Sequence, residues 1–335
     1  MADLKPLEHR QYAHCESGVV TALLKCHNIN LSEPMVFGIT GGLTFAYIPF
    51  IKMTNMPIVS YRMIPGSIIR GAGKNLDIIF KTKRYRDKKE ALAELINLID
   101  QGEIVGLQTS VYWLPYFPPE MRFQFNAHNL IVYGREGEEF LVSDPVFDHA
   151  VRITSDDLQN ARFAKGTLAP KGFLYYPVRV NSSIDLQKAI KTSIKRTVHM
   201  MLYAPIPFIG VKGIHYMGRK IERLKTHKDL RYIRLFLGHI VRMQEEIGTG
   251  GGGFRFMYAA FLQEAGQILK SQRLEEASRM MTEAGDMWRQ FALACARACK
   301  SKTADFNTED IAGLVKKCAI QEKLVYSYLK TSLIQ

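Results

Sequence analysis

The sequence predicts an α+β protein of two domains, with an antiparallel sheet in the N-terminal half and an all-helical C-terminal half. The chain has 335 residues, which is too long for one ordinary hydrophobic core and suits two. Strand-like apolar runs recur as far as Val180, and from Ile184 onward the apolar spacing is helical. We therefore expect one domain over residues 1–181 and a helical domain over residues 182–335, divided near Asn181-Ser182-Ser183.

The N-terminal half alternates predicted helices and strands. Apolar spacing predicts helices over residues 15–27 and Lys88–Gln101, and short alternating or apolar runs predict strands over 57–64, 104–109 and 172–180. Residues 126–143 read as a hairpin, in which the charged turn Arg135–Glu139 joins two strands. Such a hairpin makes its two strands antiparallel neighbours.

The C-terminal half is predicted to be helical over residues 184–202, 228–246, 254–270, 273–300 and 308–332. A loop containing Pro205, Pro207, Gly210 and Gly213 is expected after the first helix. The run Gly250–Gly253 precedes the third helix and is the one low-complexity piece.

Composition is that of a globular protein, with 47% hydrophobic and 23% charged residues. The N-terminus has no apolar secretory core and no segment is suited to span a membrane, so we expect a cytoplasmic protein. Five cysteines without a CxxC pair suggest neither a disulfide framework nor a metal site. The net charge of +13 suits an anionic partner, although it equally fits a solvated basic surface, and no nucleic-acid-binding motif is present.

Cys15 stands where a loop gives way to an apolar helical run. The unpaired N–H groups and partial positive charge of a helix N-terminus favour a thiolate, the form that attacks carbonyl carbon. The backbone N–H of Cys15 and the side chain of Gln11 could hold the oxyanion that such an attack creates. The alternative is a buried structural cysteine, because free cysteines are among the most buried residues.

His128 and Asp144 supply the partners that a cysteine nucleophile needs. His128 opens the first strand of the hairpin and Asp144 follows the second, so the two side chains should lie side by side. We expect the imidazole to lie within about 4 Å of the Cys15 sulfur, with its other ring nitrogen facing Asp144. A histidine at a strand start would otherwise be a satisfied polar group.

Six further residues are candidates for substrate contacts. A glycine run before a helix can meet an anion with its N–H groups, although a flexible linker has the same composition. Paired glycines allow close approach to a ligand or a plain turn, and an aromatic segment can wall a groove or pack on the sheet. These candidates are Gly41, Gly42, Tyr112, Gly251, Gly252 and Arg255.

A cysteine at a helix start, then a histidine, then an aspartate after a following strand is the chain order of papain-like enzymes. More closely, the sequence resembles the butirosin biosynthesis protein H family. The N-terminal half carries this resemblance through His14-Cys15, Glu33, Gly38–Tyr47, Tyr112–Tyr116, His128 and Asp144. The C-terminal half carries it through Gly250–Gly253, Phe254, Arg255, Tyr258 and Phe261.

The resemblance implies a papain-like domain and a natural-product acyltransferase. Cys15 would be the nucleophile, His128 the general base and then acid, and Asp144 the residue that orients the imidazole. The implied donor is an acyl carrier protein whose phosphopantetheine carries the acyl group, with no cofactor bound by the enzyme itself. The implied acceptor is an amine or hydroxyl of a small molecule.

Three questions stay open at this point. The same triad would serve a papain-like cysteine peptidase or amidase, because only the second nucleophile differs. A non-catalytic binding protein on the same scaffold is a third class, which the intact Cys15, His128 and Asp144 argue against. The acyl group, the acceptor and the oligomeric state, a homodimer included, are not determined by the sequence.

Overall fold

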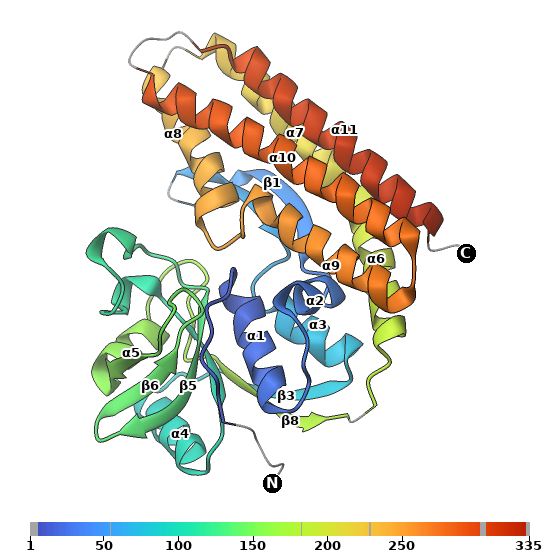
Figure 1. The fold of residues 1–335 in the computed structure, drawn as a ribbon. Helices are drawn as coiled ribbons and strands as arrows, with labels where there is room; N and C mark the ends of the chain where they lie inside the picture. Colours follow the sequence, from blue (N-terminus) through green and yellow to red (C-terminus); the bar gives the residue numbers. More distant parts are fainter. Residues whose placement is uncertain (1–5, 54, 182, 228, 302–305, 333–335) are drawn as a thin grey trace. The chain divides into compact units, whose positions relative to one another are not determined.

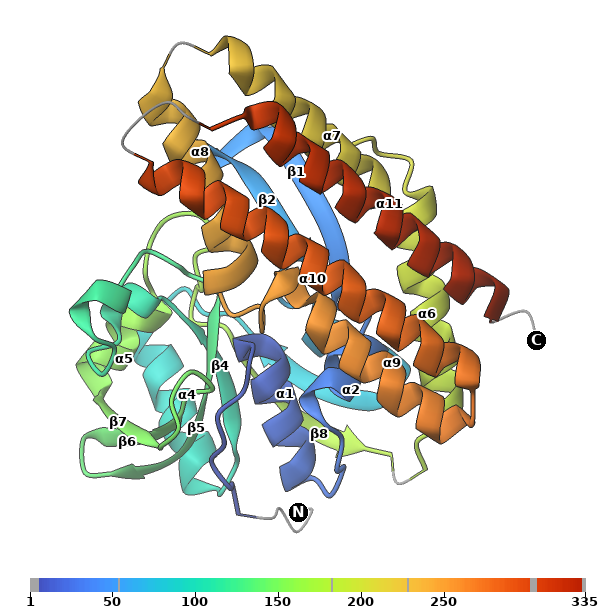
Figure 2. The same ribbon diagram turned by 45° about the horizontal axis from the view of Figure 1, so that its top comes forward.

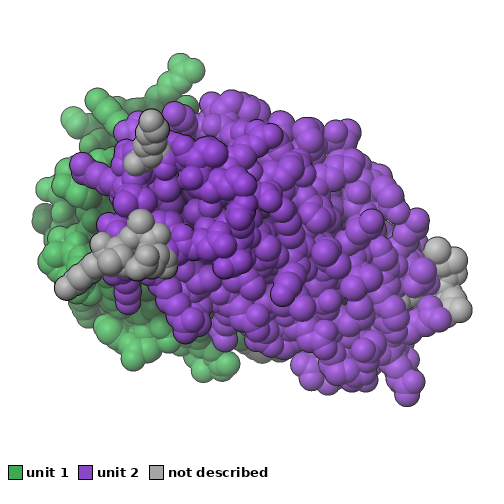
Figure 3. Space-filling model, turned by 90° about the horizontal axis from the view of Figure 1, so that it is seen from above, with its two compact units in different colours: residues 1–36, 65–184 green, residues 37–64, 185–335 purple. Residues whose placement is uncertain are grey.

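The computed structural model describes residues 6–53, 55–181, 183–227, 229–301 and 306–332 (Figure 1). By its internal contacts the chain divides into unit 1, residues 1–36 and 65–184, and unit 2, residues 37–64 and 185–335; Figure 3 colours them separately. Residues 37–64, which fall inside the predicted first domain, therefore group with the helical half. Ser182 and residue 228, where a boundary and a helix were predicted, lie outside the described residues.

The core of unit 1 is a six-stranded antiparallel sheet in the order β3-β8-β4-β5-β6-β7. The predicted hairpin is β5 and β6, and its turn is tighter than expected because the strands pair as far as Glu136 and Glu139. The strands are β3 (Ile78–Lys83), β4 (Val105–Thr109), β5 (His128–Glu136), β6 (Glu139–Ser143), β7 (Val151–Thr154) and β8 (Leu174–Val180).

Helices cover the sheet of unit 1 (Figure 2), and the first five residues of β5 are all buried. Leu130 and Val132 of β5 pack with the apolar face of α4, whereas Asn129 lies next to the start of α1. The helices of this unit are α1 (Cys15–Cys26), α3 (Ser67–Asn75), α4 (Lys88–Asp100) and α5 (Ser155–Arg162), with short 3-10 turns η1 (Val111–Trp113) and η2 (Pro119–Met121). Helix α2 (Glu33–Ile39) begins in unit 1 and ends in unit 2.

Unit 2 combines the two-stranded hairpin β1 (Leu43–Met53) and β2 (Met56–Arg62) with the C-terminal helices. Phe45 and Tyr61 from the hairpin pack on Trp288 of α10, with ring centroids 5.7 and 5.3 Å from it. The helices are α6 (Leu186–Tyr203), α7 (Gly210–Glu222), α8 (Leu230–Val241), α9 (Arg255–Leu269), α10 (Gln272–Lys300) and α11 (Thr308–Ser332), with η3 (Arg223–Thr226), η4 (Arg242–Glu246) and η5 (Gly252–Phe254) between them.

Helix α7 occupies part of the segment where the sequence predicts a loop. Its glycines hide the helical pattern, but they permit close packing within unit 2. A Cβ on Gly213 would stand 2.5 Å from the Phe208 carbonyl oxygen, closer than real Cβ atoms come, and 3.3 Å from the Phe45 ring, which is a tight contact. Strand β1, helix α3, strand β3 and helix α5 also differ from the predicted pattern, whereas the helices α1, α4, α6, α9, α10 and α11 match it within a few residues.

The α+β class, with an antiparallel sheet in the N-terminal half and a largely helical C-terminal half, is confirmed. Among the helices of the described residues, none combines the length and the hydropathy needed to cross a bilayer.

Candidate active site

Cys15 is the first residue of α1, and buried polar groups fix the start of that helix. His14 is the N-cap, and its Nδ1 accepts the Ser17 backbone N–H at 3.2 Å. The Glu33 carboxylate accepts the backbone N–H groups of Ala13 and His14, each at 2.9 Å, and the Ser17 hydroxyl at 2.7 Å. Burial raises the pKa of Glu33, and these three hydrogen bonds oppose the rise. The backbone that leads into Cys15 is thereby held in one conformation.

His128 and Asp144 meet as the hairpin predicts. His128 Nε2 lies 2.7 Å from Asp144 Oδ2, and both side chains are buried. The same carboxylate accepts the Tyr116 hydroxyl at 2.9 Å through Oδ2 and the Val146 backbone N–H at 3.0 Å through Oδ1. The Phe117 ring stands perpendicular to the imidazole at 5.6 Å. Asp144 is therefore fixed by three donors, and it fixes the imidazole in turn.

The pKa of His128 reflects this setting. Burial disfavours the imidazolium and lowers the pKa, but the charge and hydrogen bond of Asp144, together with those of the Cys15 side chain, raise it to about 10. The histidine is thus protonated at neutral pH and lies close to Cys15. Burial, and then the Asp144 charge, raise the pKa of Tyr116 well above its ordinary value, so its hydroxyl stays a donor.

Gln11 precedes α1 and contacts the loop that carries Asp144. Its side-chain amide donates to the Val146 carbonyl at 2.8 Å, and the neighbouring Tyr12 N–H donates to the Pro145 carbonyl at 2.9 Å. His9 continues the contact, with Nδ1 2.7 Å from Ser143 Oγ and Nε2 3.2 Å from the Phe147 carbonyl oxygen. The donor predicted for an oxyanion is therefore engaged in tying the segment before Cys15 to the Asp144 loop.

Two polar side chains near Cys15 were not predicted. The Asn129 Nδ2 lies 4.0 Å from the Cys15 sulfur, and the Tyr175 hydroxyl donates to Asn129 Oδ1 at 2.9 Å. Asn129 follows His128 directly in the sequence, which is the one signal that could have pointed to it. Tyr175 comes from β8, and only the sheet order brings it close.

The remaining predicted contacts belong to both units, Tyr112 to unit 1 and the glycines and Arg255 to unit 2. Tyr112 is 48% exposed on η1 and packs edge-on against Trp113. Gly41 and Gly42 are buried in the turn between α2 and β1, where Gly41 has a φ of +68° and the Gly42 N–H binds the Phe37 carbonyl at 3.0 Å. The paired glycines therefore form a plain turn, which was the alternative to close approach to a ligand.

The glycine run already holds an anion from its own unit. The Gly252 N–H lies 3.1 and 3.2 Å from the two carboxylate oxygens of Glu245, and the Gly251 N–H donates to Thr249 Oγ1 at 3.1 Å. The expectation that such donors attract negative charge is met by a side chain of this protein. Both N–H groups therefore have acceptors within unit 2 in this structure.

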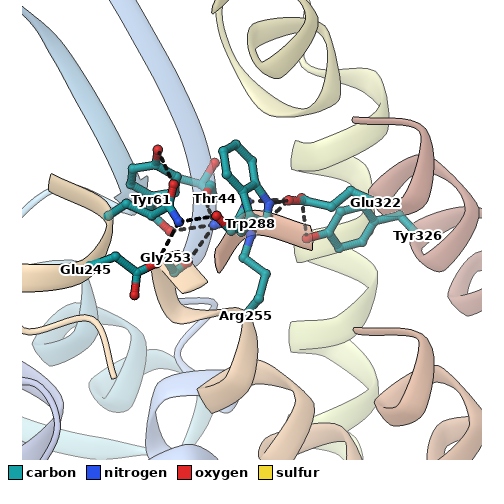
Figure 4. A network of polar contacts seen from close by, with 9 residues as sticks. Thr44, Tyr61, Glu245, Gly253, Arg255, Trp288, Glu322 and Tyr326 are labelled. Carbon is teal, nitrogen blue, oxygen red and sulfur yellow. Dashed lines mark hydrogen bonds and ion pairs between the residues drawn. The ribbon is translucent and has the colours of Figure 1, made fainter. Parts of the chain in front are cut away.

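Arg255 is fully buried in unit 2, and Figure 4 shows its polar contacts. Its Nε and Nη2 donate to the two carboxylate oxygens of Glu322 at 2.9 and 3.0 Å, and its Nη1 donates to the Gly253 carbonyl at 2.7 Å. Trp288 Nε1 and the Tyr326 hydroxyl complete the donors to Glu322, at 2.5 and 3.2 Å. Arg255 therefore organises the interior of unit 2, and its position gives no support to a phosphate contact.

No group of three or more His, Cys, Asp or Glu side chains able to hold a metal ion occurs among the described residues. Cys15, His128 and Asp144 combine a sulfur, a proton donor and an orienting carboxylate, which are the groups that nucleophilic acyl chemistry uses.

Comparison with known proteins places this site in context. The family model described as butirosin biosynthesis protein H, N-terminal, matches residues 14–145, and a domain of unknown function, DUF4872, matches residues 156–329. Among solved structures, a Bacillus anthracis protein assigned to the C39-like peptidases matches with a TM-score of 0.37 and 13% identity, over 52% of this chain and 96% of its own. A comparison with curated proteins found no match.

The pKa of His128 gives a first prediction. In a Cys15→Ala background, the Asp144 carboxylate should still hold the pKa of His128 above its ordinary value of 6.5. Adding Asp144→Asn leaves burial as the dominant effect, so the pKa should fall below 6.5. Titration of ¹³C-labelled histidine by NMR measures both values, and the other histidine signals serve as the internal control. A His128 signal unchanged between the two variants would contradict the assignment.

The pairing of His128 with Asp144 also makes the free energy of unfolding depend on pH. Because the pKa of His128 is raised in the folded protein, its contribution to the free energy of unfolding is complete below pH 6.5 and is lost as pH rises towards about 10. The stability difference between the Asp144-bearing and Asp144→Asn proteins should therefore shrink across that interval.

The buried pair in unit 2 gives a second prediction. Arg255→Met should lower the free energy of unfolding by about 3–5 kcal/mol, because it leaves the Glu322 carboxylate buried without its partner. Arg279→Met is the matched control: it breaks an exposed pair with Glu276 and should cost less than about 1 kcal/mol. Denaturant titration measures the free energy of unfolding of both variants. Equal decreases would mean that the buried pair of Arg255 and Glu322 stabilises the protein no more than an exposed pair does.

Proposed function

The chain belongs to the butirosin biosynthesis protein H family, and from this premise we propose that it is a cysteine-dependent acyltransferase. The family match supports a papain-like cysteine enzyme of biosynthesis. The finer proposal is that Cys15 takes an acyl group from an acyl carrier protein thioester and passes it to an amine or hydroxyl acceptor. The observation that carries it is the buried contact of 2.7 Å between His128 and Asp144 beside a helix-start cysteine.

The first half-reaction would form an acyl-enzyme. The Cys15 thiolate attacks the thioester carbonyl carbon, the new carbon–sulfur bond forms, and the bond to the pantetheine sulfur breaks. His128, protonated at neutral pH, gives its proton to the departing thiolate. The Cys15 backbone N–H, at the first position of α1, would bind the oxyanion that develops.

The second half-reaction would use the neutral imidazole as a base. His128 takes a proton from the acceptor amine or hydroxyl, whose lone pair attacks the acyl carbon. The carbon–sulfur bond to Cys15 breaks, and the proton on His128 restores the ion pair with the thiolate. Asp144 keeps the ring in one orientation throughout, because its carboxylate is itself held by Tyr116 and the Val146 N–H.

An acidic carrier protein would use the basic surface of unit 2. A pocket of about 330 Å³ at the end of α7 is lined by Arg219, Glu222, Arg223, Lys225 and Thr226. Glu222 is paired with Lys316 and Lys225 with Glu309, whereas Arg219 and Arg223 have no ion pair among the described residues. Arg219 and Arg223 are exposed, so they are available to acidic side chains of a partner.

The acyl-enzyme provides the direct test. Incubation with an acyl-carrier or acyl-pantetheine thioester should add the acyl mass to Cys15, and Cys15→Ala should lower turnover at least about a thousandfold. Peptide mass spectrometry locates the adduct, and Cys299→Ala is the control because Cys299 is another partly exposed cysteine. An adduct on Cys26 or Cys295 would contradict the assignment. Rapid cleavage of peptides without transfer to any amine would indicate a peptidase.

Docking has its own test. Arg219→Glu and Arg223→Glu should each lower kcat/KM for a carrier-bound donor by about fivefold to tenfold, and raising salt should lower it further in the wild type. A small pantetheine thioester should respond to neither change. Lys191→Glu reverses an exposed charge on α6 and is the control. Equal salt dependence for the two donors would argue against electrostatic docking.

A further inference from the structure

A buried polar pair stands behind the Cys15 sulfur in unit 1. Asn129 comes from β5 and Tyr175 from β8, with β4 between these strands. Gly106 on β4 lets the Tyr175 ring cross the middle strand, because a Cβ there would stand 2.6 Å from the ring. A glycine at this position thus allows a hydroxyl from β8 to reach an amide on β5.

The surroundings fix which way the Asn129 amide faces. Nδ2 donates to the Ala127 carbonyl at 3.1 Å, and Oδ1 accepts the Tyr175 hydroxyl at 2.9 Å. Turning the amide over would place Oδ1 against the Ala127 carbonyl, which is an acceptor facing an acceptor. The amide N–H group is therefore held towards the Cys15 sulfur, 4.0 Å away.

Tyr175 is suited to hold that orientation at any working pH. Burial raises its pKa well above the ordinary value, and the charges of Glu16 and Cys15 raise it further. Its hydroxyl therefore keeps its proton and donates to Asn129. Both residues are almost fully buried, so water does not compete for these bonds.

We propose that Asn129 is a catalytic residue whose amide donates a hydrogen bond to the Cys15 thiolate, and that Tyr175 is the positioning residue that keeps this amide aimed at the sulfur. The proposal rests on the proposed function in one respect, because it takes Cys15 as the nucleophile. It adds a second stabiliser of the thiolate besides the His128 imidazolium. The amide does not titrate, so this donor is present whatever the protonation state of His128.

Among the titratable groups near this site, His128 on β5 and Tyr175 on β8 interact with Cys15. Asp144 contacts His128, Glu16 follows Cys15 in the sequence, and Glu33 accepts the His14 N–H. Asn129→Ala removes a donor without changing any of these charges. The pH at which Cys15 ionises then reports on the amide alone.

The experiment follows the rate of Cys15 alkylation by iodoacetamide against pH, with the modified peptide located by mass spectrometry. Asn129→Ala should shift the profile upward by about one pH unit, which lowers the rate at acidic to neutral pH by about tenfold. Asn129→Asp should shift it further, because a carboxylate beside a thiolate disfavours both charges. Tyr175→Phe keeps the ring and should give a smaller shift in the same direction.

Asn126→Ala is the matched control. Asn126 is also buried, but its amide donates to the Lys165 and Thr167 carbonyls at 3.1 and 2.9 Å. Its loss should leave the Cys15 profile where it is in the wild type. Circular dichroism confirms that each variant is folded, and Tyr175→Phe decides the question should Asn129→Ala not fold.

The outcomes separate the two proposals. An unchanged profile in folded Asn129→Ala and Tyr175→Phe proteins would overturn the role of Asn129 and leave acyl transfer standing. A shifted profile in an enzyme that transfers no acyl group would support Asn129 and remove the acyltransferase. A wild-type Cys15 that reacts no faster than Cys299 at any pH would overturn both.

Discussion

The contact between the His128 imidazole and the Asp144 carboxylate is the interaction on which the candidate site depends. Both groups are buried, and an isolated charge there would be costly, so each is tolerated because the other is present. The buried carboxylate also needs further hydrogen-bond donors, which are the Tyr116 hydroxyl and the Val146 N–H. The segment with Gln11 and Tyr12 binds the loop that carries Asp144. The start of α1 is thereby tied to the same loop that orients the histidine.

Unit 2 also contains a buried charge that is neutralised by a partner of opposite charge. The Arg255 guanidinium and the Glu322 carboxylate neutralise one another in the interior, and Trp288 and Tyr326 satisfy the carboxylate further. The N–H group of Gly252 binds Glu245. Features that look like ligand contacts in a sequence thus stabilise the architecture here, whereas the exposed Arg219 and Arg223 lie at a pocket at the end of α7.

The sequence predicts the parts of the fold in which one pattern dominates. Helix α4 and the hairpin of β5 and β6 follow from local spacing, and the hairpin in turn places His128 beside Asp144. Helix α7 is missed because the reason for its glycines is partly tertiary, as the closeness of Gly213 to the Phe45 ring of β1 shows. The pairing of Arg255 with Glu322, and the approach of Tyr175 to Asn129 across β4, depend on residues far apart in the chain. The type of a charged or polar residue does not indicate which distant residue it will contact.

The chain passes between its two units three times, near residues 36, 64 and 184. Ribosomal synthesis is sequential, so the hairpin of β1 and β2 emerges long before α10, whose Trp288 packs on Phe45 and Tyr61. An isolated two-stranded hairpin is marginal in water. The aromatic side chains of this hairpin are therefore exposed on the nascent polypeptide while the rest of unit 1 is being synthesised. A chaperone that binds exposed aromatic side chains would act at this stage and on this segment. A fragment that stops at residue 181 would keep those side chains permanently uncovered.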